Sequence, residues 1–376
     1  MQRNIIIKNG LIVDPRNKRE EIGNLYISQG RIVAINEFAE PDIVYDATGK
    51  YVMPGLVDFH THVFRNATEI GIDADVSLLP QGVTTTADAG SAGVSNMESF
   101  IQDIVCRSAM QIKAFINVGP TGFVTMKYHG DLNPKYWDKL KLKYFLQKYP
   151  NIIKGMKLEI SRQYVGDLGI KVLEKAVSLA NELDTKLIIH TDDPPEAMDK
   201  VVQLLRAGDV FAHCYQPHGN TILGTDGKVL PCVREAQERG VIMDAANGGN
   251  HWAFSIAEAA LADGFKPDII STDLTVKTLF KDPVFGLPFV MSKYLALGMN
   301  IFDIVKCCTD TPAKALEINN SGSLGIGSRA DVAIFALKDK KTVFTDTLKQ
   351  TRIGERILVP QMTICDGRIV YRSAEF

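Results

Sequence analysis

The sequence predicts an α/β fold in which a (β/α)8 TIM barrel carries a small β-sandwich built from both ends of the chain. Through the middle of the 376 residues, strand-like and amphipathic helical segments alternate regularly, which is the pattern of a (β/α)8 barrel. Near both termini, short alternating apolar and polar segments are separated by Gly, Asn and Asp, as in small antiparallel sheets with tight turns. We therefore expect a barrel domain at residues 53–320 and a β-sandwich domain made of residues 1–52 and 321–376.

The barrel strands are expected where short apolar runs end at Gly, Pro or polar residues. They lie at residues 55–62, 82–90, 113–119, 152–160, 186–191, 209–214, 241–247 and 268–274. Amphipathic helical stretches separate them, for example at residues 97–109, 169–183 and 196–208. A doubly wound open sheet is the alternative, but no GxGxxG motif follows the first strand, as it would in a dinucleotide-binding fold of that type. We therefore favour the barrel.

Composition and charge narrow the class of partner. With 45% hydrophobic residues, 23% charged residues and a net charge of −2, the chain has the balance of a globular protein with an ample core. That charge offers no electrostatic basis for binding nucleic acid or an acidic membrane surface, and no apolar run reaches the ~18 residues of a membrane span. We expect a small-molecule substrate, with no nucleic-acid and no membrane partner. The sequence leaves the oligomeric state open, a homo-oligomer included.

Cysteine usage and the first residues indicate the compartment. The six cysteines form no CxxC motif and lie mostly in apolar segments, where reduced core thiols are expected. The first residues lack the apolar run and the cleavage site of a signal peptide. The expected location is the cytoplasm.

Two histidines close the first expected barrel strand. The run VMPGLVDFHTHVF, residues 52–64, reads as a buried strand that ends in His60 and His62. Because side chains alternate between the two faces of a strand, both imidazoles are expected on one face, together with Asp58.

Residues of the types that bind metals recur at the ends of other expected strands. In a barrel, the active site is built at these C-terminal strand ends. The residues found there are His60, His62, Lys157, His190, His213 and Asp273. One such histidine alone would more often be structural, but six groups at one rim indicate a metal site.

Lys157 requires a separate argument, because Lys154 lies on the same expected strand. The even-numbered residues 156–160 are apolar and should pack against the outer helices, so Lys157 and Glu159 point into the barrel. An unpaired ammonium in that interior is costly, and burial favours the neutral amine, which can take up CO₂ as a carbamate able to bridge two metal ions. Lys154 is expected to be a solvated charge on the outer face.

These motifs resemble the amidohydrolase superfamily, which has binuclear metal centres. The resemblance rests on the HxH pair after PGLVD and on Lys, His, His and a final Asp in barrel order, and it covers the whole chain, including the split β-sandwich. The segments GMKLEISRQYVGDLGI, DVFAHCY and DIISTDL resemble an amidohydrolase/deacetylase group often labelled dihydroorotase-like or adenine deaminase-like.

The resemblance implies two Zn²⁺ ions per chain and a set of ligands for them. His60 and His62 would hold the α metal, and His190 and His213 would hold the β metal. Carboxylated Lys157 and a hydroxide would bridge the two ions. Imidazole and carboxylate oxygen are standard zinc ligands, and paired metal ions lower the pKa of the water between them.

The resemblance also implies that Asp273 ligates the α metal and acts as the general base. A carboxylate in this position can accept the proton of the attacking water and pass it to the leaving group. The chain has no GxSxG motif for a serine nucleophile. We therefore expect attack by a metal-bridged hydroxide.

Several further residues are candidates for substrate contact. Arg162, on the segment after the fourth strand, can bind a carboxylate with two parallel hydrogen bonds. His218 and His251 lie in loops after the sixth and seventh strands, and His129 lies after the third. Asp88 ends the second strand and is expected to support the site through hydrogen bonds.

The chain departs from similar sequences near the expected substrate end of the site. Dihydroorotases typically have an Arg two residues after the HxH motif. In this chain Val63 and Phe64 follow the motif, and Arg65 is displaced. The closer group usually has His-Gly where this chain has Asn247 and Gly248, and a basic residue where this chain has Glu159. These changes leave the ligand set intact and make Asn247 a further candidate for substrate contact.

The leading functional prediction is a binuclear zinc hydrolase of an amide or ester, such as an N-acyl amino acid or an acylated α-hydroxy acid. The alternatives are a cyclic amide hydrolase of the dihydroorotase or hydantoinase type and a purine (adenine) deaminase. Deaminases of this superfamily often use one metal and a Glu near the fifth strand, and Glu196 lies too far along for that role. A non-catalytic scaffold is the remote alternative.

Overall fold

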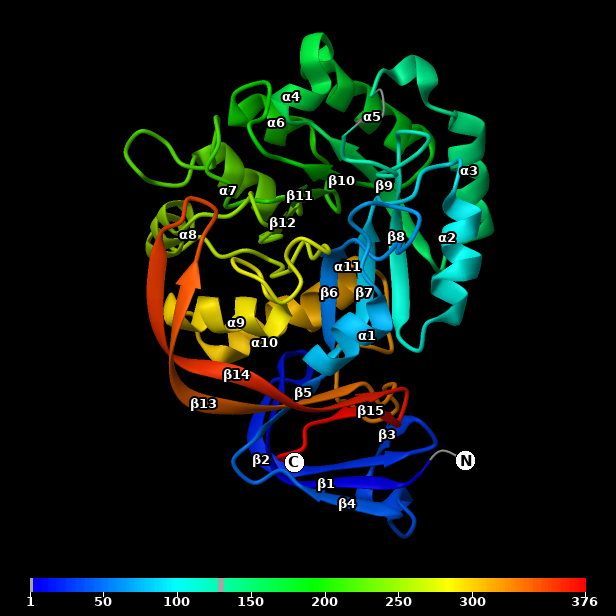
Figure 1. The fold of residues 1–376 in the computed structure, drawn as a ribbon, viewed down its shortest axis with the longest axis vertical. Coiled ribbons are helices and arrows are strands. Elements are labelled where there is room, and N and C mark those ends of the chain that lie inside the picture. The colour runs from blue at the N-terminus through cyan, green and yellow to red at the C-terminus, as the bar shows by residue number, and fades with distance from the viewer. Residues whose placement is uncertain (1–2, 128–131) are drawn as a thin grey trace.

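A parallel sheet forms the barrel of the computed structural model, which describes residues 3–127 and 132–376 (Figure 1). Within the described residues, its seven strands follow one another in chain order and pair in parallel. They are β6 Leu56–Thr61, β7 Val83–Ala89, β8 Gln111–Asn117, β9 Ile153–Glu159, β10 Lys186–His190, β11 Val210–Ala212 and β12 Ile242–Asp244. The predicted fold class is confirmed.

The eighth expected strand, residues 268–274, closes the barrel without forming a regular strand. Single bridges join Ile269 to Asp244 of β12 and Leu274 to Thr61 of β6. The amide of Asp273 donates to the carbonyl of His60 at 2.7 Å. Asp273 has φ 51°, a left-handed conformation that a β-strand does not contain, so the extended run is interrupted where it reaches the site.

Helices surround this sheet on the outside and at its lower end (Figure 1). In α5, the buried residues recur at the three- and four-residue spacing of a helix that packs one face on a core. The helix expected at 97–109 ends early, at Asp103, and a short 3-10 turn follows. The helices are α1 Ala74–Leu78, α2 Met97–Asp103, α3 Lys139–Lys148, α4 Arg162–Val165, α5 Lys171–Glu182, α6 Met198–Leu204, α7 Pro231–Glu238, α8 Phe254–Ala262, α9 Leu287–Ala296, α10 Ile301–Cys308 and α11 Asp310–Ala315.

Both ends of the chain form one further sheet of eight strands, which lies below the barrel in Figure 1. Its order is β15-β14-β13-β5-β1-β2-β3, with β4 beside β1. The strands are β1 Ile5–Asp14, β2 Arg19–Ser28, β3 Arg31–Val33, β4 Ile43–Asp46, β5 Tyr51–Pro54, β13 Val332–Thr345, β14 Thr351–Cys365 and β15 Arg368–Arg372. β5 pairs with β13 and so joins the two ends. The sheet is mixed, not purely antiparallel as expected, because β1 runs parallel to β4 and β5.

The hairpin of β13 and β14 extends from this sheet along the barrel, beside α9 and towards α8 (Figure 1). Its tip contacts the loop that follows β12. Thr347 donates from its amide to the carbonyl of Trp252 at 3.2 Å and from its hydroxyl to the carbonyl of Gly249 at 2.9 Å. A segment near the C-terminus therefore supports a loop at the barrel rim.

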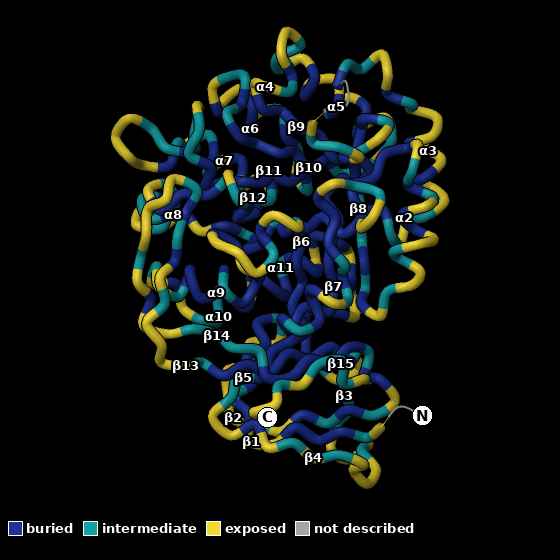
Figure 2. The backbone as a smooth tube through the Cα atoms, viewed as in Figure 1, coloured by how far each residue is buried: buried dark blue, intermediate teal, exposed yellow. Residues whose placement is uncertain are grey.

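Apolar side chains fill part of the barrel interior. One buried cluster includes Val57, Phe59, Phe115 and Ile188 from three different strands, together with Leu316 after α11. A cluster that draws on so many strands lies inside the barrel, and Figure 2 shows these strands buried. The polar groups of the site lie instead where the strands terminate. Within the described residues, none of the helices has both the length and the apolar character that crossing a membrane requires.

Candidate metal centre

Two groups of metal-ligating side chains lie at the C-terminal ends of the barrel strands. His60, His62 and Asp273 form the first, and His190, His213 and His251 form the second. Within each group, the ligand atoms lie within 4.8 Å of one another. The rings of His60 and His213 are 5.1 Å apart, so the groups adjoin. Segments that are far apart in the sequence are therefore brought to one point.

The first group is held in an orientation suited to binding a metal. His60 Nδ1 lies 3.2 Å from Asp244 Oδ2, and His62 Nδ1 lies 2.9 Å from Ser91 Oγ. These contacts engage one ring nitrogen and turn the other towards Asp273, whose Oδ1 is 3.2 Å from His62 Nε2. Carboxylates and hydroxyls that orient ligating histidines in this way are common around protein metal sites.

The second group contains a buried nitrogen with an unused lone pair. His213 Nδ1 lies 2.7 Å from the carbonyl of Ala246, so Nδ1 carries the proton and Nε2 is the acceptor. His213 Nε2 is buried and has no hydrogen-bond partner among the described residues. An orphaned imidazole nitrogen beside two other histidines is what a metal ion would satisfy.

His251 reaches the second group from the loop after β12. Its ring centre lies 4.5 Å from that of His213 and 4.7 Å from that of His190. Its Nδ1 is 3.0 Å from Asp192 Oδ2, and the other oxygen of Asp192 is 2.7 Å from His218 Nδ1. Asp192 therefore lies within ion-pair distance of both His251 and His218.

Burial keeps these imidazoles neutral. Desolvation, followed by the positive charges nearby, lowers the pKa of His60, His190 and His213 well below the usual value. The neutral ring is the form that binds a metal. The donor set therefore fits metal binding in protonation state as well as in position.

Lys157 lies between the two groups. Its side chain is 1% exposed, and its Nζ is 3.4 Å from His60 Nε2. Burial lowers the pKa of Lys157, which favours the amine that carbamate formation requires. Lys154 is elsewhere: its Nζ donates to the carbonyl of Pro150 at 3.0 Å and lies 3.8 Å from a carboxylate oxygen of Glu317. The expected inward and outward positions of the two lysines are observed, although Lys154 is ion-paired and its side chain is only 8% exposed.

Asp58 does not share the face of the two histidines, contrary to the simple alternation expected for this strand. Its carboxylate accepts from the amide and the hydroxyl of Thr272 at 3.0 and 2.7 Å. The inward residues of β6 are Val57 and Phe59, and the pairing with β7 shifts register between Asp58 and Thr61. A bulge of this kind changes which face the following side chains occupy.

Hydrogen bonds accepted by Asp88 support the loops around the site, as expected. Its carboxylate accepts from the amides of Val63 and Ser91 at 2.8 and 2.7 Å. Ser91 is the residue that contacts His62. Asp88 is thus linked to a candidate ligand through one intermediate residue.

A cavity of about 380 Å³ opens over the two groups. Its wall includes the candidate ligands His60, His62, Lys157, His190, His251 and Asp273. Around them, the wall continues with Tyr164 of α4, with the loop after the eighth segment, and with Lys349 from the tip of the β13–β14 hairpin. This volume suits a small molecule.

Of the five residues expected to contact substrate, His251 lines this cavity, whereas Arg162, His218 and Asn247 do not. Arg162 is 55% exposed, donates to the carbonyl of Pro194 and lies 3.6 Å from Asp193. His218 Nδ1 lies 2.7 Å from Asp192 Oδ1, and Asn247 accepts from the buried ammonium of Lys293 at 3.3 Å. His129 lies outside the described residues.

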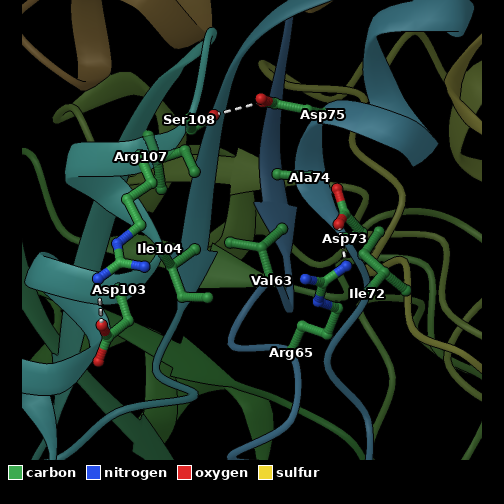
Figure 3. Close-up of a pocket in the computed structure, with 11 residues that line it drawn as sticks. Val63, Arg65, Ile72, Asp73, Ala74, Asp75, Asp103, Ile104, Arg107 and Ser108 are labelled. Atoms are coloured by element: carbon green, nitrogen blue, oxygen red, sulfur yellow. Dashed lines mark hydrogen bonds and ion pairs between the residues drawn. The ribbon is translucent and has the colours of Figure 1, made fainter.

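Arg65 belongs to a different cavity, between α1 and the segment after α2 (Figure 3). There it pairs with Asp73, while Arg107 pairs with Asp103. Both arginines are thus engaged by carboxylates, and neither lines the cavity over the histidines. The displaced arginine noted in the sequence is not in position to bind substrate there.

Three residues of the site were not predicted. Asp244 ends β12 and orients His60, Ser91 contacts His62, and Asp192 holds His251. The signal for Asp244 and Asp192 was available: each is an acidic residue at the end of an apolar barrel strand, where active-site groups collect. Nothing local distinguishes Ser91 from other loop serines.

Comparison with known proteins identifies the family to which this chain belongs. The model of the amidohydrolase family matches residues 51–370. A deacetylase of Agrobacterium fabrum is 30% identical, with 87% of this chain and 81% of that protein covered. A deacetylase of Enterococcus faecalis is also 30% identical, with 98% and 99% covered. A dihydroorotase of Clostridioides difficile is 24% identical over 98% of this chain and all (100%) of its own.

Solved structures show the same arrangement. A structure described as a dihydroorotase has a TM-score of 0.90, with 28% identity and coverage of 99% of this chain and 98% of its own. One described as an adenine deaminase has a TM-score of 0.89, with 28% identity and coverage of 99% and 100%. A D-hydantoinase, with a TM-score of 0.68 and 17% identity, shares the fold.

Proposed function

Because this chain belongs to the amidohydrolase family, and is a metal-dependent hydrolase with two histidine-rich candidate metal sites, we propose that it cleaves an amide or ester bond at a binuclear zinc centre. The observation that carries the proposal is the pair of adjoining ligand groups with the buried Lys157 between them. Nitrogen and carboxylate ligands of this kind are typical of zinc. Calcium or magnesium would require mostly oxygen.

The ligands divide between the two ions. His60, His62 and Asp273 would hold one ion, and His190 and His213 would hold the other, with His251 close enough to add a third nitrogen. Lys157, as its carbamate, would contribute an oxygen to each. When bound, such ions polarise the scissile carbonyl and make water acidic enough to attack at neutral pH.

Proton transfer is assigned to Asp273. Its carboxylate faces the cavity and is 12% exposed, so it reaches both the ligand group and a bound substrate. It would accept the proton of the attacking water and return it to the leaving amine or alcohol, as a general base and then a general acid. Asp244 and Ser91 have the supporting task of fixing the tautomers of His60 and His62.

Removal of an acyl group is the reaction that we favour, in keeping with the deacetylases at 30% identity. We retain the substrate expectation of an N-acylated or O-acylated small molecule, and the domain division at residues 53–320. Cyclic amide hydrolysis and adenine deamination remain the alternatives within the family, because the names of similar proteins include dihydroorotases and an adenine deaminase.

A substrate panel separates these reactions. Protein loaded with zinc would be assayed against N-acyl amino acids, O-acyl hydroxy acids, dihydroorotate, a hydantoin and adenine. We expect turnover of at least one acyl compound, with release of the carboxylic acid. Turnover of only a cyclic amide, or of adenine alone, would contradict the deacylation proposal in favour of the corresponding alternative.

A further inference from the structure

Glu159 is a cavity residue with no assigned role in the metal centre. It is the last residue of β9 and lines the cavity over the two ligand groups. Alternation along the strand places it on the same face as Lys157, two residues earlier. Because the strand runs towards the rim, Glu159 lies one step nearer than Lys157 to where a substrate enters.

The carboxylate of Glu159 borders the cavity and has no partner among the described residues. The residue is 7% exposed, and no donor in residues 3–127 or 132–376 hydrogen-bonds to it or lies within ion-pair distance. Removing a carboxylate from water without compensation is costly. Such a group is therefore expected to find its donor in something that enters the cavity.

The neighbouring acidic residues, unlike Glu159, have partners within the protein. Asp58 accepts two hydrogen bonds from Thr272, Asp88 accepts two from backbone amides, and Asp244 accepts one from Ser271 at 2.6 Å. Asp192 is engaged by two histidines. Within the described residues, these neighbouring buried acids have partners in the protein, whereas Glu159 has none.

The donor that Glu159 lacks could be neutral or cationic, and the charge of a carboxylate favours a cation. In the proposed centre Lys157, two residues earlier on β9, is a carbamate, so it would not pair with Glu159 as an ammonium. A neutral donor would satisfy a hydrogen bond, whereas a cation would also offset the charge of the Glu159 carboxylate.

We propose that Glu159 is a specificity-determining residue that binds a cationic nitrogen of the substrate. The hydrolysed amide or ester would then carry an ammonium, amidinium or guanidinium group in addition to its acyl group. This inference rests on the proposed function and deepens it by naming the substrate class. Glu159 binds and orients the substrate, and Asp273 and the metal ligands carry out the cleavage.

Matched substrates test the proposal. N-acetyl-1,4-diaminobutane carries an ammonium, N-pentylacetamide has a methyl group in its place, and 4-acetamidobutanoate carries a carboxylate. A mirrored series of N-butyl amides of ω-amino acids places the ammonium on the acyl side. We expect kcat/KM for the ammonium compound of at least one series to exceed that of its methyl isostere about 10- to 100-fold, the range of a hydrogen bond to a charged group.

The variant Glu159→Gln keeps the shape and removes the charge. The ratio of kcat/KM for ammonium over methyl substrate should fall at least about tenfold in this variant. Glu196→Gln, the same change at a surface ion pair with Lys200, should leave the ratio as it is. Zinc content measured on each variant shows that the centre is intact. An unchanged ratio in Glu159→Gln, or equal turnover of all three substrates, would overturn the inference while the proposed function stands.

Binding provides a test that does not depend on turnover. Hydroxamates bind zinc through their own oxygens. Calorimetry would therefore compare the affinities of ω-aminoalkyl hydroxamates, which carry an ammonium, with those of isosteres that carry a methyl group in its place. We expect tighter binding of the amino compounds, lost in Glu159→Gln. Zinc-loaded protein that turned over no acyl compound would contradict the proposed function, and equal affinity for the two hydroxamates would separately overturn the role of Glu159.

Discussion

At the scale of single residues, the two lysines of β9 distinguish a functional position from a structural one. Lys157→Ala should lose activity and at least one metal ion, because it removes the group placed between the two sets of ligands. Short carboxylic acids such as acetate should restore part of the activity by replacing the carbamate oxygens. Lys154→Ala, which alters only the contacts to Pro150 and Glu317, should remain active. Metal analysis and turnover of both variants check this, and exchanged phenotypes would show that the inward face has been misassigned.

Asp273→Asn tests the proton-transfer role. Asp273 has φ 51°, and Asn adopts this region at least as readily as Asp, so the backbone should tolerate the change. The amide retains an oxygen for the metal but cannot accept a proton. We expect kcat to fall about 10²–10⁴-fold, with a smaller effect on KM. Steady-state kinetics with parallel zinc analysis measures this. If kcat stays near normal with both metals bound, another group transfers the proton, and His251 is then the next residue to test.

Most residues of the centre could be predicted because their chemistry and position in a strand agree. Polar, metal-type side chains at the ends of apolar strands are conspicuous, as with His190 and Lys157. The position of Asp58 could not be predicted because it depends on a register shift in β6, which alternation does not reveal. Arg162 could be proposed as a substrate contact from the sequence, but its guanidinium donates to the carbonyl of Pro194 at 3.2 Å and lies 3.6 Å from Asp193, both in the loop after β10.

At the scale of elements, Lys293 of α9 links three segments around the cavity. Its buried ammonium donates to the carbonyls of Pro283 and Thr345 at 2.9 and 3.2 Å and to Asn247 at 3.3 Å. It also lies 4.5 Å from the ring centre of Trp252. The loop after the eighth segment, the β13–β14 hairpin and the loop after β12 are thereby joined. None of these contacts is visible in sequence spacing, because the partners lie up to 52 residues away.

The pH dependence of stability should report on Lys293. Burial lowers the pKa of Lys293 from 10.5 to about 7. Between these values the unfolded chain binds more protons than the folded chain, so the free energy of unfolding contributed by this residue rises with pH, by at most ~1.4 kcal/mol per pH unit. Urea unfolding of metal-free native protein and of Lys293→Met, at pH 6 to 9, measures the difference. The native protein should gain relative to the variant above pH 7. Parallel curves would contradict the lowered pKa.

Element boundaries were predictable where a pattern was long and regular. The terminal strands and seven of the barrel strands occur close to where alternation placed them. The eighth segment was expected as a strand from its apolar run, yet its backbone turns at Asp273 to deliver a ligand. The order of strands in the mixed sheet was not predictable, since which strands pair is decided by packing between the two ends of the chain.

At the scale of the whole molecule, the barrel and the terminal sheet contribute different parts of the site. The barrel brings ligands from strands far apart in sequence to one rim, while the terminal sheet sends its long hairpin to support a rim loop and to place Lys349 in the cavity wall. The fold class was predictable from the alternation of strands and helices over most of the chain. The contribution of the hairpin was not, because it is a contact between the two domains that no local pattern encodes.

Metal stoichiometry of active protein tests the central claim most directly. The six predicted ligand residues, which the fold brings together, should bind close to two zinc ions per chain. In a titration of metal-free protein, activity should rise until the second equivalent is bound, with metal content determined on the same samples. Protein that is fully active with only trace metal would contradict the account, and activity that is complete at one equivalent would contradict its binuclear form.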